Sequence, residues 1–393
     1  MSWKIFLATL LSVAMLMSTV LTSCSPAPSS SPAANPSDNA EFEVIRQAAD
    51  DWVNSVKEIN ITSRQLYDSI MATIALTGYK IEWYDPLTYQ KAPLVVDVRG
   101  GDSEMPDPYT AGHIPGSFHI PWRSAADSNY LRKLDKGRQI AIVSSTGQTG
   151  AEVAAVLGLL GYDTINLMYG MTAWTSDPIA APGRYDKARD TVWDWGGSYR
   201  AVCPISEPSD IYPYPIVNNT ASKDTFDIIQ AAAMAYLHGG KRENMPAQEL
   251  YHALHFEELK EPLWFFTNPV SPAENPFSVP FLLDVRTDDS YENGHLCGTL
   301  HFYYKDLFKP ENLQRLPPDR QILVYSDTGH ESGVVTALLN MLGYDAINLK
   351  WGIAGWSLSL PGKDVAPERF IEERDCINAA IIIGYQSFLP CPG

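Results

Sequence analysis

Two serines open corresponding turns of this chain, and serine is a side chain that can act as a nucleophile. Ser144 begins the turn SSTGQTG at 144–150, and Ser326 begins the turn SDTGHES at 326–332. A serine hydroxyl becomes nucleophilic only when an adjacent base, held by a third group, accepts its proton. The remaining residues of the first turn are all uncharged: Ser145, Thr146, Gly147, Gln148, Thr149 and Gly150. The first turn therefore offers Ser144 no base.

The second turn does carry titratable side chains. Its remaining residues are Asp327, Thr328, Gly329, His330, Glu331 and Ser332. Residues one and four positions away from a serine on a tight turn usually point away from it. We therefore expect His330 and Glu331 to be solvated loop residues, and a serine-dependent hydrolase using Ser326 remains an alternative.

The backbone of each turn has its own chemistry. Gly147 and Gly329 permit a sharp bend, and the apolar segments AEVAAVLGLLGY and GVVTALLNMLGY follow directly. Backbone N–H groups that converge at a helix N-terminus favour anions. We expect the first turn to bind a small oxyanion, sulfate or thiosulfate, with help from the Ser144 and Thr149 hydroxyls. The second turn should bind less well because Asp327 and Glu331 are negative; empty turns, or turns that contact a partner protein, are the alternatives.

Long repeats indicate which elements hold these turns. The segment GYDTINLMYGMTAW at 161–174 returns as GYDAINLKWGIAGW at 343–356, and residues 41–70 align with 225–253 at helical spacing. Each half also has two short apolar strands, one of which ends in Asp-Val-Arg and the other in the serine. Strands that alternate with helices predict an α/β fold with a parallel sheet in each half.

These motifs together resemble the rhodanese (sulfurtransferase) family over most of residues 41–360. The combination is DVR, GHIPG, the strand-turn-helix and the closing GY…NL…G…W. The resemblance implies two rhodanese-like domains, each a small parallel sheet flanked by helices. It also implies that Ser144 and Ser326 stand where the family carries a cysteine that accepts a sulfane sulfur as persulfide. Because a hydroxyl cannot form that S–S bond, we expect neither turn to support persulfide chemistry.

Other motif residues are expected to be structural. By the resemblance, Asp97 with Arg99, and Asp284 with Arg286, tie loops together at a strand end. His113 and His295 lie in a turn rich in glycine and are expected to hold it by hydrogen bonds. No second His, Cys or carboxylate falls at ligand spacing from them, so we expect no metal and no cofactor.

Cys297 replaces the proline of the GHIPG motif in the second copy, GHLCG. It is a candidate displaced thiol, through which the chain could still be a sulfurtransferase; a disulfide or an inert thiol are the other interpretations. The four cysteines beyond the N-terminal region are Cys203, Cys297, Cys376 and Cys391, and they allow three pairings.

The N-terminus resembles a bacterial lipoprotein signal peptide. Lys4 precedes an apolar run that ends in small residues before Cys24. We expect a signal peptide at 1–23 and an exported protein anchored to the membrane by a lipid on Cys24. The remaining divisions are a tether at 24–40, domains at 41–200 and 224–375, a linker at 201–223 and a tail at 376–393, whose INAAIIIGY run should pack on the body.

The chain is acidic, with a formal net charge of −17. Such a charge argues against nucleic acid as a partner. Three classes of function remain: a non-catalytic tethered module, a sulfurtransferase and a serine hydrolase. The missing turn cysteines favour the first, which would bind an oxyanion or an unknown protein through the retained turns.

Overall fold

The computed structural model describes nine stretches of the chain. They are residues 40–75, 92–100, 107–192, 208–217, 220–255, 279–356, 359–360, 363–364 and 369–383. The expected signal peptide and almost all of the tether, together with Cys24, Cys203 and Cys391, lie outside these residues. Within the described stretches, no helix combines the length and apolar character that crossing a membrane would require.

The first half forms one parallel sheet of five strands in the order β1-β5-β4-β2-β3. Its strands are β1 (Asn60–Ile61), β2 (Leu94–Asp97), β3 (Phe118–His119), β4 (Ile140–Val143) and β5 (Thr164–Leu167). Every residue of β2, β4 and β5 is buried. Helices cover both faces of such a sheet, so its strands are continuously apolar rather than alternating.

The second half repeats this topology in the order β6-β10-β9-β7-β8, again all parallel. Its strands are β6 (Asn244–Met245), β7 (Phe281–Asp284), β8 (Leu300–His301), β9 (Ile322–Tyr325) and β10 (Ala346–Leu349). A separate antiparallel pair joins β11 (Ser359–Leu360) to β12 (Lys363–Asp364). The expectation of two α/β units with parallel sheets is confirmed.

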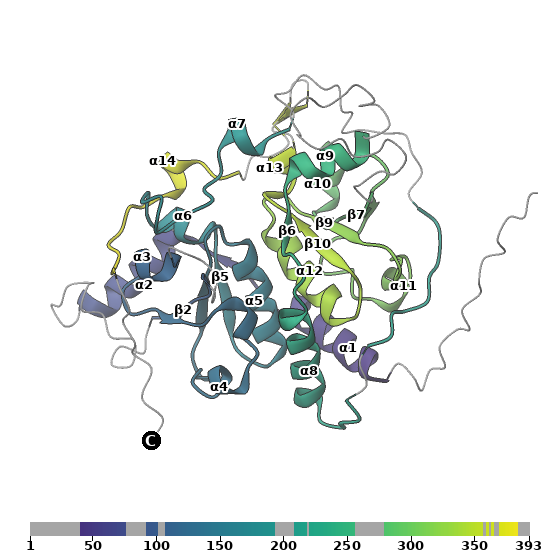
Figure 1. The fold of residues 1–393 in the computed structure, drawn as a ribbon, viewed down its shortest axis with the longest axis horizontal. Coiled ribbons are helices and arrows are strands. Elements are labelled where there is room, and N and C mark those ends of the chain that lie inside the picture. Colours follow the sequence, from purple (N-terminus) through teal and green to yellow (C-terminus); the bar gives the residue numbers. More distant parts are fainter. Residues whose placement is uncertain are drawn as a thin grey trace, which may run out of the picture. The chain divides into compact units, whose positions relative to one another are not determined.

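Helices flank both sheets (Figure 1). The first half contains α1 (Ala40–Ser55), α2 (Ser63–Ala75), α3 (Pro108–Ala111), the 3₁₀ turn η3 (Trp122–Ser124), α4 (Ser128–Leu131), α5 (Gln148–Leu159), α6 (Gly170–Trp174) and α7 (Lys187–Asp190). The second contains α8 (Thr225–His238), α9 (Ala247–His255), α10 (Asp288–Asn293), α11 (Pro310–Leu313), α12 (His330–Met341), α13 (Gly352–Trp356) and α14 (Glu372–Asp375).

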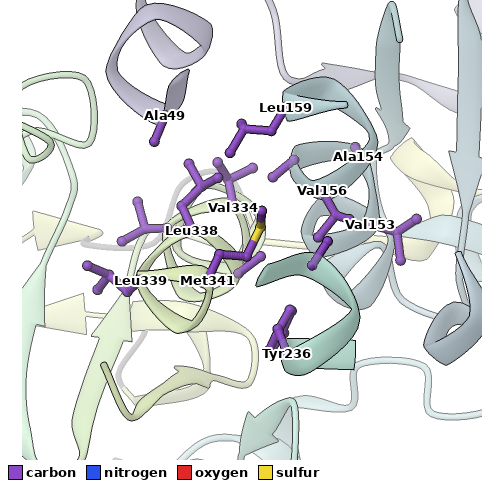
Figure 2. Close-up of a cluster of buried hydrophobic side chains, with 14 of the residues drawn as sticks. Ala49, Val153, Ala154, Val156, Leu159, Tyr236, Val334, Leu338, Leu339 and Met341 are labelled. Atoms are coloured by element: carbon purple, nitrogen blue, oxygen red, sulfur yellow. The ribbon is translucent and has the colours of Figure 1, made fainter. Parts of the chain in front are cut away.

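The helices α5 and α12 pack against each other and join the two halves through one hydrophobic core. Figure 2 shows Val156 and Leu159 of α5 on the side that faces Val334 and Met341 of α12. Both helices are buried on nearly all sides, and such a helix must be apolar all round. This position explains why the segments after the two turns carry so few polar residues.

The first helix of each half crosses to the other half. In α1, Arg46 donates to the Phe308 carbonyl (2.9 Å). In return, Arg123 of η3 donates to the Leu237 carbonyl of α8 (3.0 Å), and Gln230 of α8 donates to the Ala126 carbonyl (2.9 Å). Each of these helices also packs on its own half, α1 on α5 and α8 on α12, so both lie between the two halves.

The segments that follow each repeat are exchanged between the halves. Residues 184–192 reach the second half, where the Tyr185 hydroxyl donates to the Ala354 carbonyl (3.2 Å). Residues 369–382 return to the first half, where the Ile377 and Ala379 amides donate to the Ala173 and Trp174 carbonyls (3.0 and 2.9 Å). We call 184–192 the first strap and 369–382 the second strap. The expected packing of the tail is thus confirmed for the part of the INAAIIIGY run that the structure describes.

Candidate functional site

Both serines lie where a strand becomes a helix, as expected. Ser144 follows β4 and precedes α5, and Ser326 follows β9 and precedes α12. Their side chains are buried, with 4% and 1% of each residue exposed. The Gly147 amide donates to Ser144 Oγ (3.0 Å), and the Gly329 amide donates to Ser326 Oγ (3.1 Å). Each hydroxyl oxygen is therefore engaged by its own turn.

The two turns interlock. Gln148 Nε2 donates to the Thr328 carbonyl of the other turn (3.1 Å), and His330 Nε2 accepts from the Tyr169 amide (3.2 Å). A Cβ at Gly147 would lie 2.6 Å from His330 Nε2, and a Cβ at Gly329 would lie 2.6 Å from Gln148 Nε2. Both glycines also have φ near +90°, which a residue with a Cβ rarely adopts. Glycine is required here by the bend and by the neighbouring turn.

The expectation that His330 is solvated is wrong. The ring is 0% exposed, and its Nδ1 lies 2.7 Å from Thr328 Oγ1. Burial lowers the pKa of His330 to about 4, although a hydrogen bond with the Thr146 backbone opposes this shift. The imidazole is therefore neutral at pH 7, and it points at the opposite turn because α12 begins against α5.

The expectation for Glu331 is also wrong. Its carboxyl accepts a hydrogen bond from Asn60 Nδ2 of the other half (3.3 Å) and one from the Ser326 hydroxyl. Burial raises the pKa of Glu331, and the Ser326 and Asn60 bonds partly oppose this shift. The side chain turns inward because the other half supplies an amide donor there.

The first turn does not have the neutral surroundings that its sequence indicates. Thr149 Oγ1 donates to Glu243 Oε2 (3.0 Å), and Glu243 belongs to the second half. A carboxylate thus stands beside each turn, Glu243 at the first and Glu331 at the second. No reading of the first turn alone could have found Glu243, because the charge arrives from a residue 94 positions away.

The two turns differ in the side chains that surround their serines. In the second, Ser332 Oγ lies 2.6 Å from Asn348 Oδ1 and 3.1 Å from Ser326 Oγ. In the first, Gly150 replaces that serine, and Asn166 Oδ1 is buried without a hydrogen-bond partner. Ser326 is therefore held by more side chains than Ser144.

A cleft of about 250 Å³ opens beside the second turn. The first half contributes Ile59 and Asn60 to its wall, and the second half contributes the rest. The other lining residues are Val285, Arg286, Thr287, Tyr303, Tyr304, Ser326, Asp327 and Glu331. The cleft was not predictable from either repeat alone, because Ile59 and Asn60, in and beside β1 of the first sheet, meet the second turn only where the two halves contact each other.

A family model described as the rhodanese-like domain matches residues 81–177 and again residues 271–359. The chain carries two rhodanese-like domains. A Mycobacterium tuberculosis protein provisionally named thiosulfate sulfurtransferase SseB is 30% identical over 97 residues, which cover 21% of this chain and 34% of that relative. The chain therefore matches about a third of the length of its curated relatives.

Solved structures are also similar to this chain. A rhodanese-like domain protein from Staphylococcus aureus is 27% identical and covers 30% of this chain and 92% of its own, with a TM-score of 0.22. The 3-mercaptopyruvate sulfotransferase SseA from Escherichia coli is 12% identical and covers 75% and 98%, with a TM-score of 0.25.

Each rhodanese-like domain contains a buried Asp–Arg pair at the end of its second strand. Arg99 binds Asp97 (2.5 Å) and donates to the carbonyls of Pro108, Gly112 and Ala180. Arg286 binds Asp284 (2.6 Å) and donates to the Gly294 carbonyl (2.6 Å). These guanidinium groups join the strand end to the loops around it.

The histidines of the GHIPG turn make local contacts. His113 Nδ1 lies 3.0 Å from the Tyr109 carbonyl, and His295 Nδ1 lies 2.9 Å from the Tyr291 carbonyl. Each ring stacks on that tyrosine, with centroids 4.0 and 3.8 Å apart. The described residues contain no group of three or more His, Cys, Asp or Glu side chains that could hold a metal ion.

Cys297 is disulfide-bonded, whereas Cys376 is a free thiol. The partner of Cys297 lies outside the described residues. A sulfur in a disulfide is no free nucleophile, so in this state Cys297 cannot serve as the displaced thiol.

One buried carboxyl was missed by sequence reasoning. Glu152 of α5 is 0% exposed, and the Tyr236 hydroxyl of α8 donates to its Oε2 (2.6 Å). Burial, and to a lesser degree the charge of Glu243, raise the pKa of Glu152 well above its usual value. A single glutamate inside the apolar run AEVAAVLGLLGY was the available signal, because α12 has Val334 in the corresponding place.

Proposed function

We propose that this chain is an exported, lipid-tethered and non-catalytic pair of rhodanese-like domains, which binds a small ligand or a partner protein through the cleft beside the second turn. One observation supports the proposal that the chain is not a sulfurtransferase. The position that would accept sulfur is a buried serine in both domains, and each hydroxyl accepts a hydrogen bond from its own turn. An alcohol cannot become a persulfide.

The cleft supports the binding part of the proposal. It is built by both domains, and its wall includes the buried Ser326 and the inward Glu331. The first turn is the weaker candidate for an oxyanion, because Thr149 already donates to the Glu243 carboxylate. Like charges at the mouth of a site disfavour an anion.

The alternative of a serine hydrolase is less well supported. Ser326 does contact a carboxyl group, that of Glu331. However, its residue is 1% exposed, so a substrate carbonyl has little access to Oγ. A fluorophosphonate probe should leave Ser326 unlabelled; labelling that disappears in Ser326→Ala would support the hydrolase instead.

A thiosulfate:cyanide assay tests the non-catalytic proposal. We expect no turnover by the full-length protein in detergent, under oxidising or reducing conditions. Turnover that persists in Cys297→Ser would refute the proposal. Turnover that appears only after reduction and vanishes in Cys297→Ser would show that the displaced thiol is a sulfur carrier.

The tether is tested separately. The motif around Cys24 supports cleavage before this residue and lipid attachment to it. Mass spectrometry of the native N-terminus should find a lipid-modified cysteine as the first residue. An unmodified N-terminus at another position would exclude the anchor without affecting the proposal for the cleft.

A further inference from the structure

We propose that the cleft beside the second turn takes a small cation, an alkylammonium or guanidinium group, rather than an oxyanion. This inference rests on the proposed binding function of that cleft and specifies the chemistry of its ligand.

The size of the cleft limits the ligand to a group about as large as one side chain. Its volume is about 250 Å³. Pockets that enclose drug-sized molecules are usually roughly 300–1,000 Å³. An amine on a short alkyl chain fits this space, either as a free molecule or as a lysine or arginine side chain of a polypeptide.

The carboxylate of Glu331 has no cationic partner in the described part of the chain. Its contacts are neutral donors, the Asn60 amide and the Ser326 hydroxyl. A partly buried carboxylate without a counter-ion carries a desolvation cost that an entering cation would offset. Because burial raises the pKa of Glu331, an entering cation would also favour its charged form.

The positive charge in the wall is already neutralised. Arg286 binds the buried Asp284 at 2.6 Å, and its Nη1 also lies 3.6 Å from Asp327. Arg286 is thus balanced by the buried Asp284, and no other cation among the described residues lines the cleft. Lys305 is near Tyr304 but directs its Nζ at the Val56 carbonyl (3.3 Å) and does not line the cleft.

Two tyrosines complete the wall. The rings of Tyr303 and Tyr304 meet edge to face, with centroids 4.8 Å apart. Burial and the nearby Tyr303 and Glu331 raise the pKa of Tyr304, so its hydroxyl is neutral and adds no charge. Aromatic faces beside carboxylates are favourable surroundings for ammonium and guanidinium groups.

Titration with matched probes tests the inference. The probes are n-butylammonium, its uncharged analogue n-butanol, thiosulfate, and the peptide acetyl-Gly-Lys-Gly-amide, each added to the full-length protein in detergent. Backbone amide shifts and calorimetry are the measurements. We expect butylammonium to move the amides of residues 326–331 and not those of 144–150, and butanol and thiosulfate to move neither.

Two variants assign the binding to the proposed charges. Glu331→Gln should weaken butylammonium binding at least tenfold, whereas Glu311→Gln, an exposed carboxylate of the same domain, should leave it unchanged. Asp327→Asn is the second variant if Glu331→Gln fails to fold. It should also weaken binding, because it removes a carboxylate from the lining of the cleft. Equal affinity in wild type and both variants would overturn the inference.

The remaining outcomes separate the inference from the proposed function. If thiosulfate moves residues 326–331 and butylammonium does not, the cation is excluded while the cleft remains a binding site. If neither probe moves them, both proposals fail. Tighter binding of the lysine peptide than of butylammonium would indicate a polypeptide partner, and equal binding would indicate a free amine.

Discussion

The residue that follows each turn glycine decides much of the chemistry of the site. Gln148 and His330 occupy equivalent positions, and each reaches into the opposite domain. They differ in one respect: glutamine cannot titrate, whereas histidine can. The second domain has therefore gained a proton-sensitive group at the centre of the molecule.

This difference predicts acid sensitivity. The pKa of His330 is about 4 in the folded state and about 6.5 when unfolded, so the unfolded chain binds more protons in between. Stability should fall as pH decreases from 6.5 towards 4, by about 3 kcal/mol in total. Urea unfolding at pH 7 and at pH 4.5 measures this loss, and in His330→Gln it should be absent. His238→Gln, which changes an exposed histidine, should keep the wild-type loss; the same loss in His330→Gln would exclude the mechanism.

Glu152 predicts a pH dependence of stability with the opposite sign to that of His330. Its pKa is raised in the folded state, so its neutral form stabilises the fold below the unfolded pKa, and this contribution is lost as pH rises through the folded pKa. Glu152→Gln keeps an acceptor for the Tyr236 hydroxyl without the charge. Its free energy of unfolding should exceed that of wild type more at pH 8.5 than at pH 5. An unchanged difference at the two pH values would mean that Glu152 does not titrate there; Glu292→Gln, at an exposed position, is the control.

At the scale of elements, the packing of α1 on α5 leaves no space for a larger side chain. A Cβ at Gly158 of α5 would lie 2.2 Å from Nε1 of Trp52 in α1. Gly158→Ala should therefore separate the two helices and lower the free energy of unfolding by roughly 1–3 kcal/mol. Gly137→Ala, in an exposed loop, is the control and should change it by less than about 0.5 kcal/mol. Equal effects of the two substitutions would show that α1 does not pack as described.

Removal of the second strap should destabilise the first domain, although the two are far apart in the sequence. It lies beyond the second domain but pairs with the first, through Ile377, Ala379 and the bridge between His113 and Ile382. A chain that ends at Asp375 should lose amide-exchange protection at His113 and stability throughout the first domain. A chain that ends at Ile383 keeps the strap contacts with the first domain and should retain protection at His113. Protection at His113 in the shorter chain would contradict the exchange of straps.

Two strands of each sheet and both turns could be predicted from the sequence, and the exchange of segments between the halves could not. Continuous apolar runs such as LVVDVR mark buried parallel strands, and glycine marks the turn. Repeats, however, describe each half by itself and do not say which copy an element contacts. The side chains that contact the turns were missed for the same reason, since Glu243 and Asn60 come from the opposite domain. One signal was available, because RYDKARDTV at 184–192 repeats as RFIEERDCI at 369–377.

For the whole molecule, these exchanges predict one unfolding transition. The core runs from α1 through α5 and α12 to α8, and each domain is completed by segments of the other. Neither domain can lose its structure while the other keeps its full core. Calorimetry should give one endotherm, with equal calorimetric and van't Hoff enthalpies. Two resolved endotherms would contradict this coupling.

The second strap also sets an order for events on the ribosome. The first domain needs residues 377–382 to cover α6, and these are made after all of the second domain. At the usual speed of synthesis, roughly 10 to 40 seconds separate the end of the first repeat from that point. For this time the apolar faces of α5 and α6 have no permanent cover. We therefore expect the nascent chain to bind a chaperone, or to follow an export path that accepts it unfolded, until residues 377–382 are made.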